Sequence, residues 1–600
     1  MVTWKWTLTG FLLLSFSAVA QQPTDASPSA RTNPATTAQA ANPASPESSS
    51  AQAVQPPPTT MDQVVDRAIQ REHALMNFLK SRTPLVETYL QNLKPDPDLG
   101  AVPKEDHYFL GRIDLASVDR HDYLSKDENF EKNLLGGFTR LFRSEYQPMG
   151  FSWMIFADRD DFGRIHYDFK YSHREFAGDV RCLVFDVTPK KDAGKGRFVG
   201  RIWVEDQDYN IVRLNGTYAP RPRNAYFFHM DSWRLNLVPG YWLPAYIYSE
   251  EGDFSYGHKD KIAFKAQSRV WGYNLKQTGK EDELTDVKVD AVKDESPAAA
   301  DASPLEAQRQ WQQQAEDNVV VRLEKAGLLA PAGDVDKVLD TVINNLIVTN
   351  NLVLARPVHA RVMLTTPLET FSVGNTIVVS RGLIDVLPDE PSLAAVLSHE
   401  LAHIALGHNL GSKFAFNDRM FFSDDRTYTN LGFRHSPAEE AAADAKAMEL
   451  LKNSPYGQKL DTASLFFKQL SARAPQLQAL LTTHLGNSFM TDKGQLIRLA
   501  ALVSTGPALD IKKLDQIAAL PIGGRIKLNA WDDKIELSKS APVAIVTARD
   551  KMPLEVTPFF PHLTRMNNAV EIPAAEKASA ELPADSANTP QHERLNPGTR

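Results

Sequence analysis

The sequence predicts a multidomain α+β protein, in which a mainly antiparallel β domain precedes a mostly helical domain that contains a small sheet. Three observations support this prediction. With 600 residues, the chain is longer than one hydrophobic core usually organises. Short aromatic and β-branched runs dominate from about residue 107 to residue 277, as in antiparallel strands. After residue 305, apolar residues recur mainly at the spacing of helices.

The first twenty residues have the pattern of a secretory signal peptide. Lys5 supplies a positive charge, the run from Leu8 to Phe16 supplies a short apolar core, and the small residues ending at Ala20 fit a cleavage site. An uncleaved membrane anchor is the alternative, but a spanning helix needs about 20 apolar residues and this run is shorter. We therefore expect an exported protein, periplasmic or associated with the cell envelope, whose mature chain has no transmembrane helix.

Three segments are poor in large apolar side chains and are predicted to be linkers or tails. Residues 21–60 and 294–304 combine Pro, Ala and Ser, and residues 572–600 have a similar composition. The expected organisation follows from these breaks: a signal peptide (1–20), a linker (21–60), a helix and β domain (61–293), a second linker (294–304), a helical domain with a C-terminal extension (305–571) and a tail (572–600).

The overall composition is that of a globular protein without a basic excess. Hydrophobic residues make up 42% of the chain, charged residues 23%, and the formal net charge is −8. This charge argues against a general nucleic-acid partner and against charge-driven adhesion to anionic lipid. Because Cys182 is the only cysteine, the chain cannot form an internal disulfide bond. Its apolar neighbours predict a buried strand position.

The β domain is predicted to begin with helical structure, since apolar residues between Met61 and Leu93 recur at helical spacing. Further along, the runs Phe198–Val204 and Ile211–Leu214 are separated by turn residues and predict a hairpin. Cross-strand packing explains the many aromatic residues of this domain, and ligand binding is the alternative.

The segment from Phe198 to Tyr248 is similar in pattern to the half-barrel domains of the bacterial lipoprotein-carrier type. Its strands are rich in aromatic side chains, including Trp233 and Tyr246. The resemblance implies a curved sheet. It also implies a concave apolar face that takes up a lipid, an acyl chain or a peptide.

A His-Glu-x-x-His pattern at His399 and His403 is the strongest chemical signal in the sequence. Residues four apart in a helix lie one above the other, so both imidazoles can face one zinc ion. Glu400 lies one position round the helix, where its carboxylate can reach a water molecule on the metal. Two core histidines without a metal are the alternative. Pro391 marks a helix start just upstream and favours the zinc site.

A third metal ligand is predicted on a second helix. Ser436 and Glu439 form a capping box, so Glu439 already has a structural role at the helix start. Glu440 is then free to turn inward as the ligand, and a solvated surface charge is the alternative. Asp444 lies four residues further on the same face, where it can accept the outer N–H of a ligating histidine.

Three segments resemble peptidase family M48 in order and spacing: residues 375–384, residues 393–403 and the run from Glu440 to Asp444. The resemblance covers about residues 305–505. It implies a zincin-like metallopeptidase domain with one Zn²⁺ per chain. It also implies the residue roles at the site, with Glu400 as general base and with the zinc ligands His399, His403 and Glu440.

Because no spanning helix is expected, the soluble periplasmic branch is the closer analogue within that family. In that branch a histidine downstream of the third ligand lies near the metal, and His484 corresponds to it. The resemblance implies gating or transition-state stabilisation by His484. The proline that commonly follows is replaced by Leu485, and an ordinary surface or core histidine is the alternative.

The predicted function is zinc-dependent hydrolysis of peptide bonds in the bacterial cell envelope, by a metal-activated water with Glu400 as general base. Protein or peptide substrates, envelope quality control and a lipid or lipoprotein at the β domain are the associated expectations. The alternative function is a lipid- or lipoprotein-binding assembly factor or chaperone that uses the peptidase fold as a scaffold. The run Ile377–Ser380 is predicted to be a strand, either an exposed edge for substrate or an interior strand.

Overall fold

The computed structural model describes the following residues: 56–96, 100–113, 120–123, 151, 153–158, 161–220, 228–255, 261–273, 304–408, 432–491, 493–509, 526–529, 534–537, 554–556 and 558–566. The predicted signal peptide, the linkers except for residues 56–60 and 304, and the predicted tail lie outside them. All described helices and strands belong to one compact unit that begins at Pro58. Within this part of the chain, no helix combines the length and apolar character that crossing a bilayer requires.

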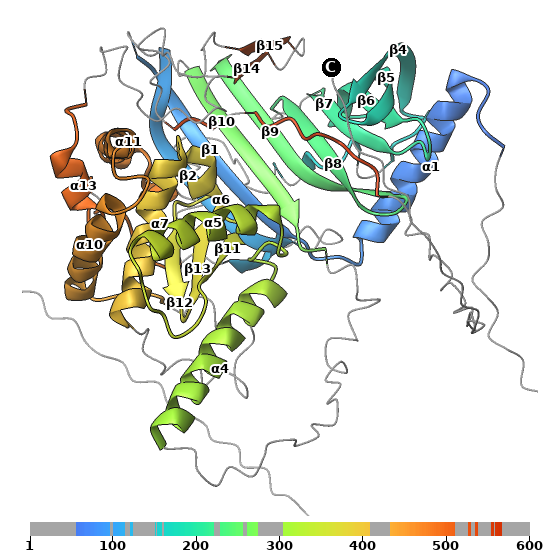
Figure 1. The fold of residues 1–600 in the computed structure, drawn as a ribbon. Coiled ribbons are helices and arrows are strands. Elements are labelled where there is room, and N and C mark those ends of the chain that lie inside the picture. Colours follow the sequence, from blue (N-terminus) through green and yellow to red (C-terminus); the bar gives the residue numbers. More distant parts are fainter. Residues whose placement is uncertain are drawn as a thin grey trace, which may run out of the picture. The chain divides into compact units, whose positions relative to one another are not determined.

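A ten-stranded antiparallel sheet forms the N-terminal domain, in the order β3-β2-β1-β10-β9-β8-β7-β6-β5-β4. The sheet is curved (Figure 1), and register shifts in several pairings allow its strands to bend. The predicted hairpin is β6 and β7. The strands are β1 (Leu85–Asp96), β2 (Gly100–Ile113), β3 (Arg120–Tyr123), β4 (Tyr167–Ala177), β5 (Val180–Pro189), β6 (Arg197–Glu205), β7 (Ile211–Ala219), β8 (Met230–Val238), β9 (Tyr241–Ser255) and β10 (Lys261–Trp271).

The helix expected between Met61 and Leu93 is shorter than predicted. Helix α1 (Met61–Leu79) begins at the N-cap Thr60 and ends before Pro84, and β1 follows. Proline disfavours helical structure in the residue before it, and the next residues alternate between the two faces of the sheet. The prediction of helix beyond residue 79 was therefore wrong.

Helix α1 covers one face of the sheet. Its apolar stripe packs in one hydrophobic core with sheet residues such as Val86, Phe264 and Ile247. Glu72 of α1 forms a buried two-point ion pair with Arg234 of β8, with oxygen to nitrogen distances of 2.6 and 2.7 Å. Loss of either partner would leave a buried charge, so this pair fixes α1 on the sheet.

The opposite face of the sheet shares a hydrophobic core with the helical domain. Tyr89, Trp203, Trp233 and Tyr246 point to this face. It also contacts residues 554–556 and 558–566, which we call the C-terminal strap. The sequence analysis placed this segment in the C-terminal extension of residues 305–571, and in the structure it lies against the sheet.

The C-terminal region is mostly helical with a small sheet, so the predicted fold class is confirmed. Strands β11 (His359–Met363), β13 (Thr376–Ser380) and β12 (Thr370–Val373) form a sheet in the order β11-β13-β12, so Ile377–Ser380 is an interior strand. A separate hairpin pairs β14 (Ile526–Asn529) with β15 (Lys534–Leu537). The helices are α4 (Pro304–Lys325), α5 (Asp334–Thr349), α6 (Arg381–Val386), α7 (Glu390–Leu406), α10 (Pro437–Lys452), α11 (Leu460–Arg473), the 3₁₀ helix η3 (Ala474–Gln476), α12 (Gln478–Leu481) and α13 (Ala500–Thr505).

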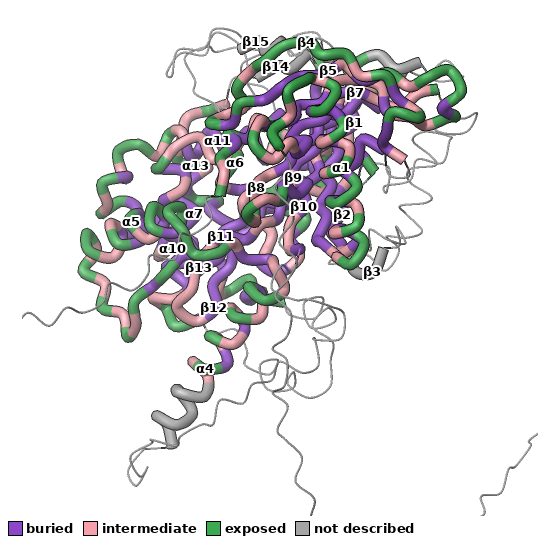
Figure 2. The backbone as a smooth tube through the Cα atoms, turned by 90° about the vertical axis from the view of Figure 1, so that its right-hand side faces the viewer, coloured by how far each residue is buried: buried purple, intermediate pink, exposed green. Residues whose placement is uncertain are grey.

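Buried residues are concentrated in the strands of the ten-stranded sheet and in β13, whereas α5 exposes one face (Figure 2). Helix α7 is buried at nearly every position from Pro391 to His403. Cys182 is buried in β5, as predicted, and burial raises the pKa of its thiol to about 12. Any polar residue on α7 must therefore find partners inside the protein.

His229 lies just before β8, and its burial makes the free energy of unfolding of the protein depend on pH. Burial lowers the pKa of His229 to about 4, and its Nε2 donates a hydrogen bond to Oδ1 of Asn215 at 3.0 Å. Between pH 6.5 and 4 the unfolded chain binds a proton that the folded chain excludes, so stability falls as pH falls through this window. The loss is on the order of 3 kcal/mol for this group.

We expect His229→Gln to remove most of this pH dependence, since the glutamine amide keeps a donor and does not titrate. Urea unfolding of both proteins between pH 7 and 4 measures the effect. At pH 7 the wild-type protein should have the larger free energy of unfolding. Because only the wild type loses stability as the pH falls, this difference should narrow or reverse toward pH 4. Parallel curves across this range would contradict the assignment.

Candidate metal centre

Local sequence determines the start and the end of α7. Asp389 accepts a hydrogen bond from the backbone N–H of Ser392 at 3.0 Å, and Pro391 lies in the first turn. Gly407 ends the helix with φ of 68°, a conformation that glycine adopts without strain. The predicted helix therefore forms around His399 and His403, which lie on one buried face.

Helix α10 supplies the opposing carboxylates. The predicted capping box is present: the hydroxyl of Ser436 accepts from the backbone N–H of Glu439, and the Glu439 carboxylate accepts from the backbone N–H of Ser436. Glu440 and Asp444 are both buried on the face that meets α7.

Three predicted ligands converge between these two helices. Nε2 of His399 lies 3.1 Å from Oε2 of Glu440, and Nε2 of His403 lies 3.2 Å from Nε2 of His399. Each residue is at most 2% exposed. Among the described residues, this is the one group of three or more histidine, cysteine or acidic side chains whose ligand atoms come this close, all within 4.8 Å. Two imidazole nitrogens and one carboxylate are a donor set that suits hydrolytic zinc.

The outer nitrogen atoms of both histidines also have neighbours. Nδ1 of His399 lies 2.8 Å from Oδ1 of Asp444, the position predicted for that carboxylate. Nδ1 of His403 lies 3.0 Å from Nδ1 of His408, and the ring of His435 stacks on His403 with centroids 3.8 Å apart. Such contacts hold an imidazole in one orientation and one tautomer. His408 and His435 were not assigned roles from the sequence.

Glu400 is completely buried next to the three ligands. Its Oε1 accepts a hydrogen bond from Nη1 of Arg498 at 2.9 Å, while Oε2 has no hydrogen-bond partner among the described residues. A buried carboxylate oxygen without a partner is costly and is a feature of functional sites. Oε2 is thus the atom available for a proton or a water molecule.

Arg498 is another residue at this centre that the sequence analysis did not assign. Its guanidinium pairs with Glu440 at 2.9 and 3.2 Å and with Glu400, and it also donates to the carbonyl of Thr370 at 3.1 Å. It is 1% exposed. The sequence holds no motif around Arg498, because the fold alone brings it to the two carboxylates.

The charges at this centre are strongly coupled. Burial by itself would raise the pKa of Glu440, but hydrogen bonds with both histidines and the charge of Arg498 outweigh burial and hold it well below its usual range. Burial would likewise lower the pKa of His399, yet the carboxylates of Asp444 and Glu440 raise it. This shift favours the anionic form of Glu440, which is the form in which a carboxylate binds a metal ion.

A second residue that the sequence analysis did not assign is Asn487. It lies in a loop after α12, and its side chain forms hydrogen bonds at the start of α10. Its Nδ2 donates to Oε1 of Glu440 at 2.7 Å and to the carbonyl of His435 at 3.1 Å. Its Oδ1 accepts from the backbone N–H of His435 at 3.0 Å. Asn487 thus holds the start of α10 and the ligand carboxylate in one geometry.

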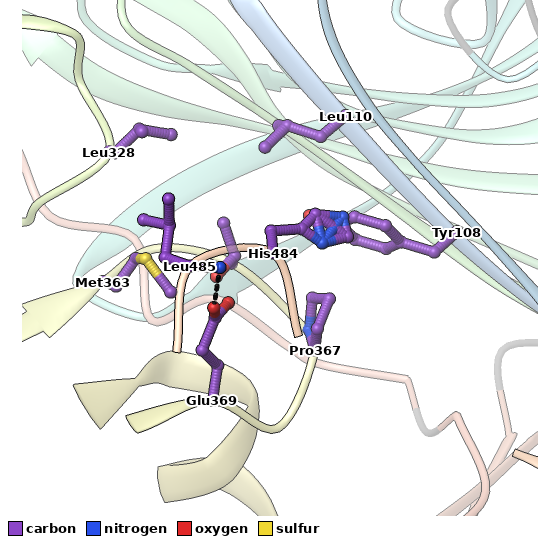
Figure 3. Close-up of a pocket in the computed structure, with 9 residues that line it drawn as sticks. Tyr108, Leu110, Leu328, Met363, Pro367, Glu369, His484 and Leu485 are labelled. Atoms are coloured by element: carbon purple, nitrogen blue, oxygen red, sulfur yellow. Dashed lines mark hydrogen bonds between the residues drawn. The ribbon is translucent and has the colours of Figure 1, made fainter. Parts of the chain in front are cut away.

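The structure places His484 at the contact between helical domain and sheet. Its ring meets Tyr108 of β2 edge-on, with centroids 5.3 Å apart. Both line a small cavity of about 20 Å³ (Figure 3), where Glu369 accepts a hydrogen bond from the backbone N–H of Leu485. His484 packs here between the domains, and its suggested role at the metal stays a prediction.

Buried carboxylates of the sheet hold the helical domain in place. Glu87 of β1 accepts hydrogen bonds from the backbone N–H and the hydroxyl of Thr366 at 2.5 and 2.8 Å. Asp106 of β2 accepts from the backbone N–H groups of Ala479 and Leu480, both at 2.8 Å. Charge-assisted bonds of this kind are among the stronger hydrogen bonds in proteins.

The fold and the donor set together define a candidate metallopeptidase domain. Residues 335–516 match the model of peptidase family M48, the family that the sequence motifs resemble. No curated protein matches the chain.

Solved structures give only weak likenesses to the β domain. A LolA superfamily protein from Nitrosomonas europaea is 10% identical over 36% of this chain and 96% of its own, with a TM-score of 0.17. A putative outer membrane lipoprotein-sorting protein domain from Vibrio parahaemolyticus is 10% identical over 34% of this chain and 91% of its own, with a TM-score of 0.17.

We expect Arg498→Met to destabilise the metal-free protein by about 3–5 kcal/mol, because two buried carboxylates lose their partner. Added zinc should recover part of this loss, since a bound cation compensates the same charges. Urea unfolding with and without zinc measures both effects.

The matched control is Arg356→Met, which removes a half-exposed ion pair with Asp317. This substitution should cost less than about 1 kcal/mol and should not respond to zinc. Equal losses in the two variants would contradict the role assigned to Arg498.

Proposed function

We propose that this chain is a zinc-dependent endopeptidase of the bacterial cell envelope that hydrolyses protein or peptide substrates. The observation that supports this most directly is the convergence of His399, His403 and Glu440 beside Glu400. The zinc ion would be held by these two imidazoles and this carboxylate, and it would supply Lewis-acid activation of water and of the scissile carbonyl.

The chain's own groups would move the protons. Glu400 is the general base, because its Oε2 is the unsatisfied carboxylate atom at the centre. It takes the proton of the attacking water and returns it to the leaving amine. Arg498 fixes the other carboxylate oxygen and thereby aims Oε2. Asp444 holds the ring of His399 in the orientation that ligation needs.

Export and biological role rest on the sequence. The signal-peptide pattern of residues 1–20 supports a periplasmic or envelope location, and removal of misfolded envelope proteins is a role consistent with it. The alternative, a lipid-binding assembly factor, has less support. Helix α1 covers one face of the sheet, and the helical domain and the C-terminal strap cover the other.

Metal content tests the ligand assignment. We expect purified wild type to hold one zinc ion per chain by elemental analysis and His403→Ala to hold almost none. His359→Ala, at an exposed histidine on β11, is the control and should keep wild-type zinc. Zinc retained in His403→Ala would contradict the proposed site.

Hydrolysis tests the general base. Glu400→Gln should keep its zinc and lose about 10²–10⁴-fold in the rate of cleavage of an unfolded protein substrate, because the amide cannot accept the proton. The rate is measured by release of labelled fragments, with zinc content determined on the same sample. Undiminished cleavage by the zinc-loaded variant would exclude Glu400 as the base.

A further inference from the structure

The C-terminal strap lies on the sheet without forming a helix or a strand of its own. Drawn in red in Figure 1, it runs across β10, β9 and β8. Its ends reach Gln91 of β1 and the turns that follow β4 and β6. An irregular segment that crosses several strands must satisfy its backbone groups with side chains of the sheet.

The sheet provides such side chains. The amide of Gln91 donates to the carbonyl of Leu554 at 2.8 Å and accepts from the N–H of Val556 at 2.7 Å. One side chain therefore satisfies two backbone groups on the same side of an extended segment, as a neighbouring strand would. This pairing does not depend on the strap's own side chains.

Main-chain recognition continues along the strap. The hydroxyl of Tyr246 accepts from the N–H of Phe559 at 3.2 Å, and Oδ1 of Asn236 accepts from the N–H of Met566 at 2.6 Å. At the turn after β4, Gly178 has φ of 69°, and a Cβ there would lie 2.4 Å from the backbone of Leu563. Only glycine leaves room for this approach.

Ion pairs lie near both ends of the strap. Glu555 pairs with Lys265 of β10 at 2.8 Å, and Arg565 pairs with Glu205 and Asp206 at 2.5 and 3.2 Å. Between them, Leu563 is fully buried. The arrangement selects an extended chain that has apolar residues in the middle and an acidic and a basic residue toward its N- and C-terminal ends, respectively.

The sheet face under the strap suits a peptide better than an acyl chain. The guanidinium of Arg213 lies between the rings of Trp203 and Trp233, at 4.3 and 4.5 Å, and pairs with Asp231. Polar groups such as Gln91 need hydrogen-bond partners when they are covered. An acyl chain has none to offer, so it would leave buried polar atoms unsatisfied.

We propose that this face is a binding site for an extended polypeptide segment and that the C-terminal strap occupies it in cis. The site is separate from the metal centre but close to the helical domain, since Arg381 of α6 lies 6.0 Å from the ring of Phe559. Attachment in cis gives the strap a high effective concentration, so another polypeptide binds only when the strap leaves. The proposal concerns binding alone and does not depend on peptidase activity.

The test uses the full-length, zinc-free chain and a fluorescein-labelled synthetic peptide of residues 552–568. Leu563→Asp removes the buried apolar side chain and should release the strap. The affinity of this variant for the peptide should therefore exceed that of the wild-type protein at least about tenfold. Arg565→Ala, a milder change, should give an intermediate affinity. Circular dichroism establishes that each variant retains the fold.

Two changes test main-chain recognition. Adding Gln91→Ala to Leu563→Asp should weaken peptide binding about tenfold, because a two-point hydrogen bond is lost. A peptide N-methylated at Val556 should weaken binding similarly while keeping every side chain. If neither change affects binding, the proposed mode of recognition is overturned.

A third experiment avoids destabilising substitutions. A specific protease site placed between residues 540 and 550 allows the strap to be cut from the chain while its contacts remain. The labelled peptide should exchange into the protein only after cleavage. Peptide that never binds, in the cleaved chain and in both variants, would overturn the proposal. So would a released face that binds fluorescent palmitate and not the peptide.

Discussion

Everything at the candidate metal centre depends on how the fold tolerates two carboxylates buried side by side. Glu400 and Glu440 are almost completely excluded from solvent, where an uncompensated charge is very costly. Arg498 bonds to both, and the two histidines add further hydrogen-bonding groups. The same balance leaves one oxygen of Glu400 unsatisfied. The packing of α7, α10 and the chain before α13 therefore determines which oxygen of Glu400 is available for a proton or a water molecule.

A comparable constraint applies to the sheet, because hydrophobic cores lie against both faces of its described strands. Helix α1 seals one face through an apolar stripe and the Glu72–Arg234 pair. The helical domain and the strap share the other, which is aromatic but also rich in hydrogen-bonding groups. The two faces therefore differ in chemistry. The face under α1 is suited to a permanent apolar contact, and the face under the strap is suited to recognition of polypeptide backbone.

Several features were predictable because their causes are local in sequence. The caps at Asp389 and Ser436, the end at Gly407 and the four-residue spacing of His399 and His403 act within one or two helical turns. The interior position of β13 was left open, since strand order depends on partners elsewhere in the chain. The expected helix beyond residue 79 failed for a similar reason: in a short apolar stretch, pairing with β2 and β10 outweighed helical spacing.

By itself, then, the sequence determined the class of fold, the two helices of the metal centre and the residues that face each other across them. These follow from periodicity, capping and side-chain chemistry, which act over short distances. Tertiary structure alone decided that Arg498 and Asn487 join the centre, that His484 packs against the sheet, and that the strap covers it. Such contacts join residues far apart in sequence, and chain folding brings them together without leaving a local pattern.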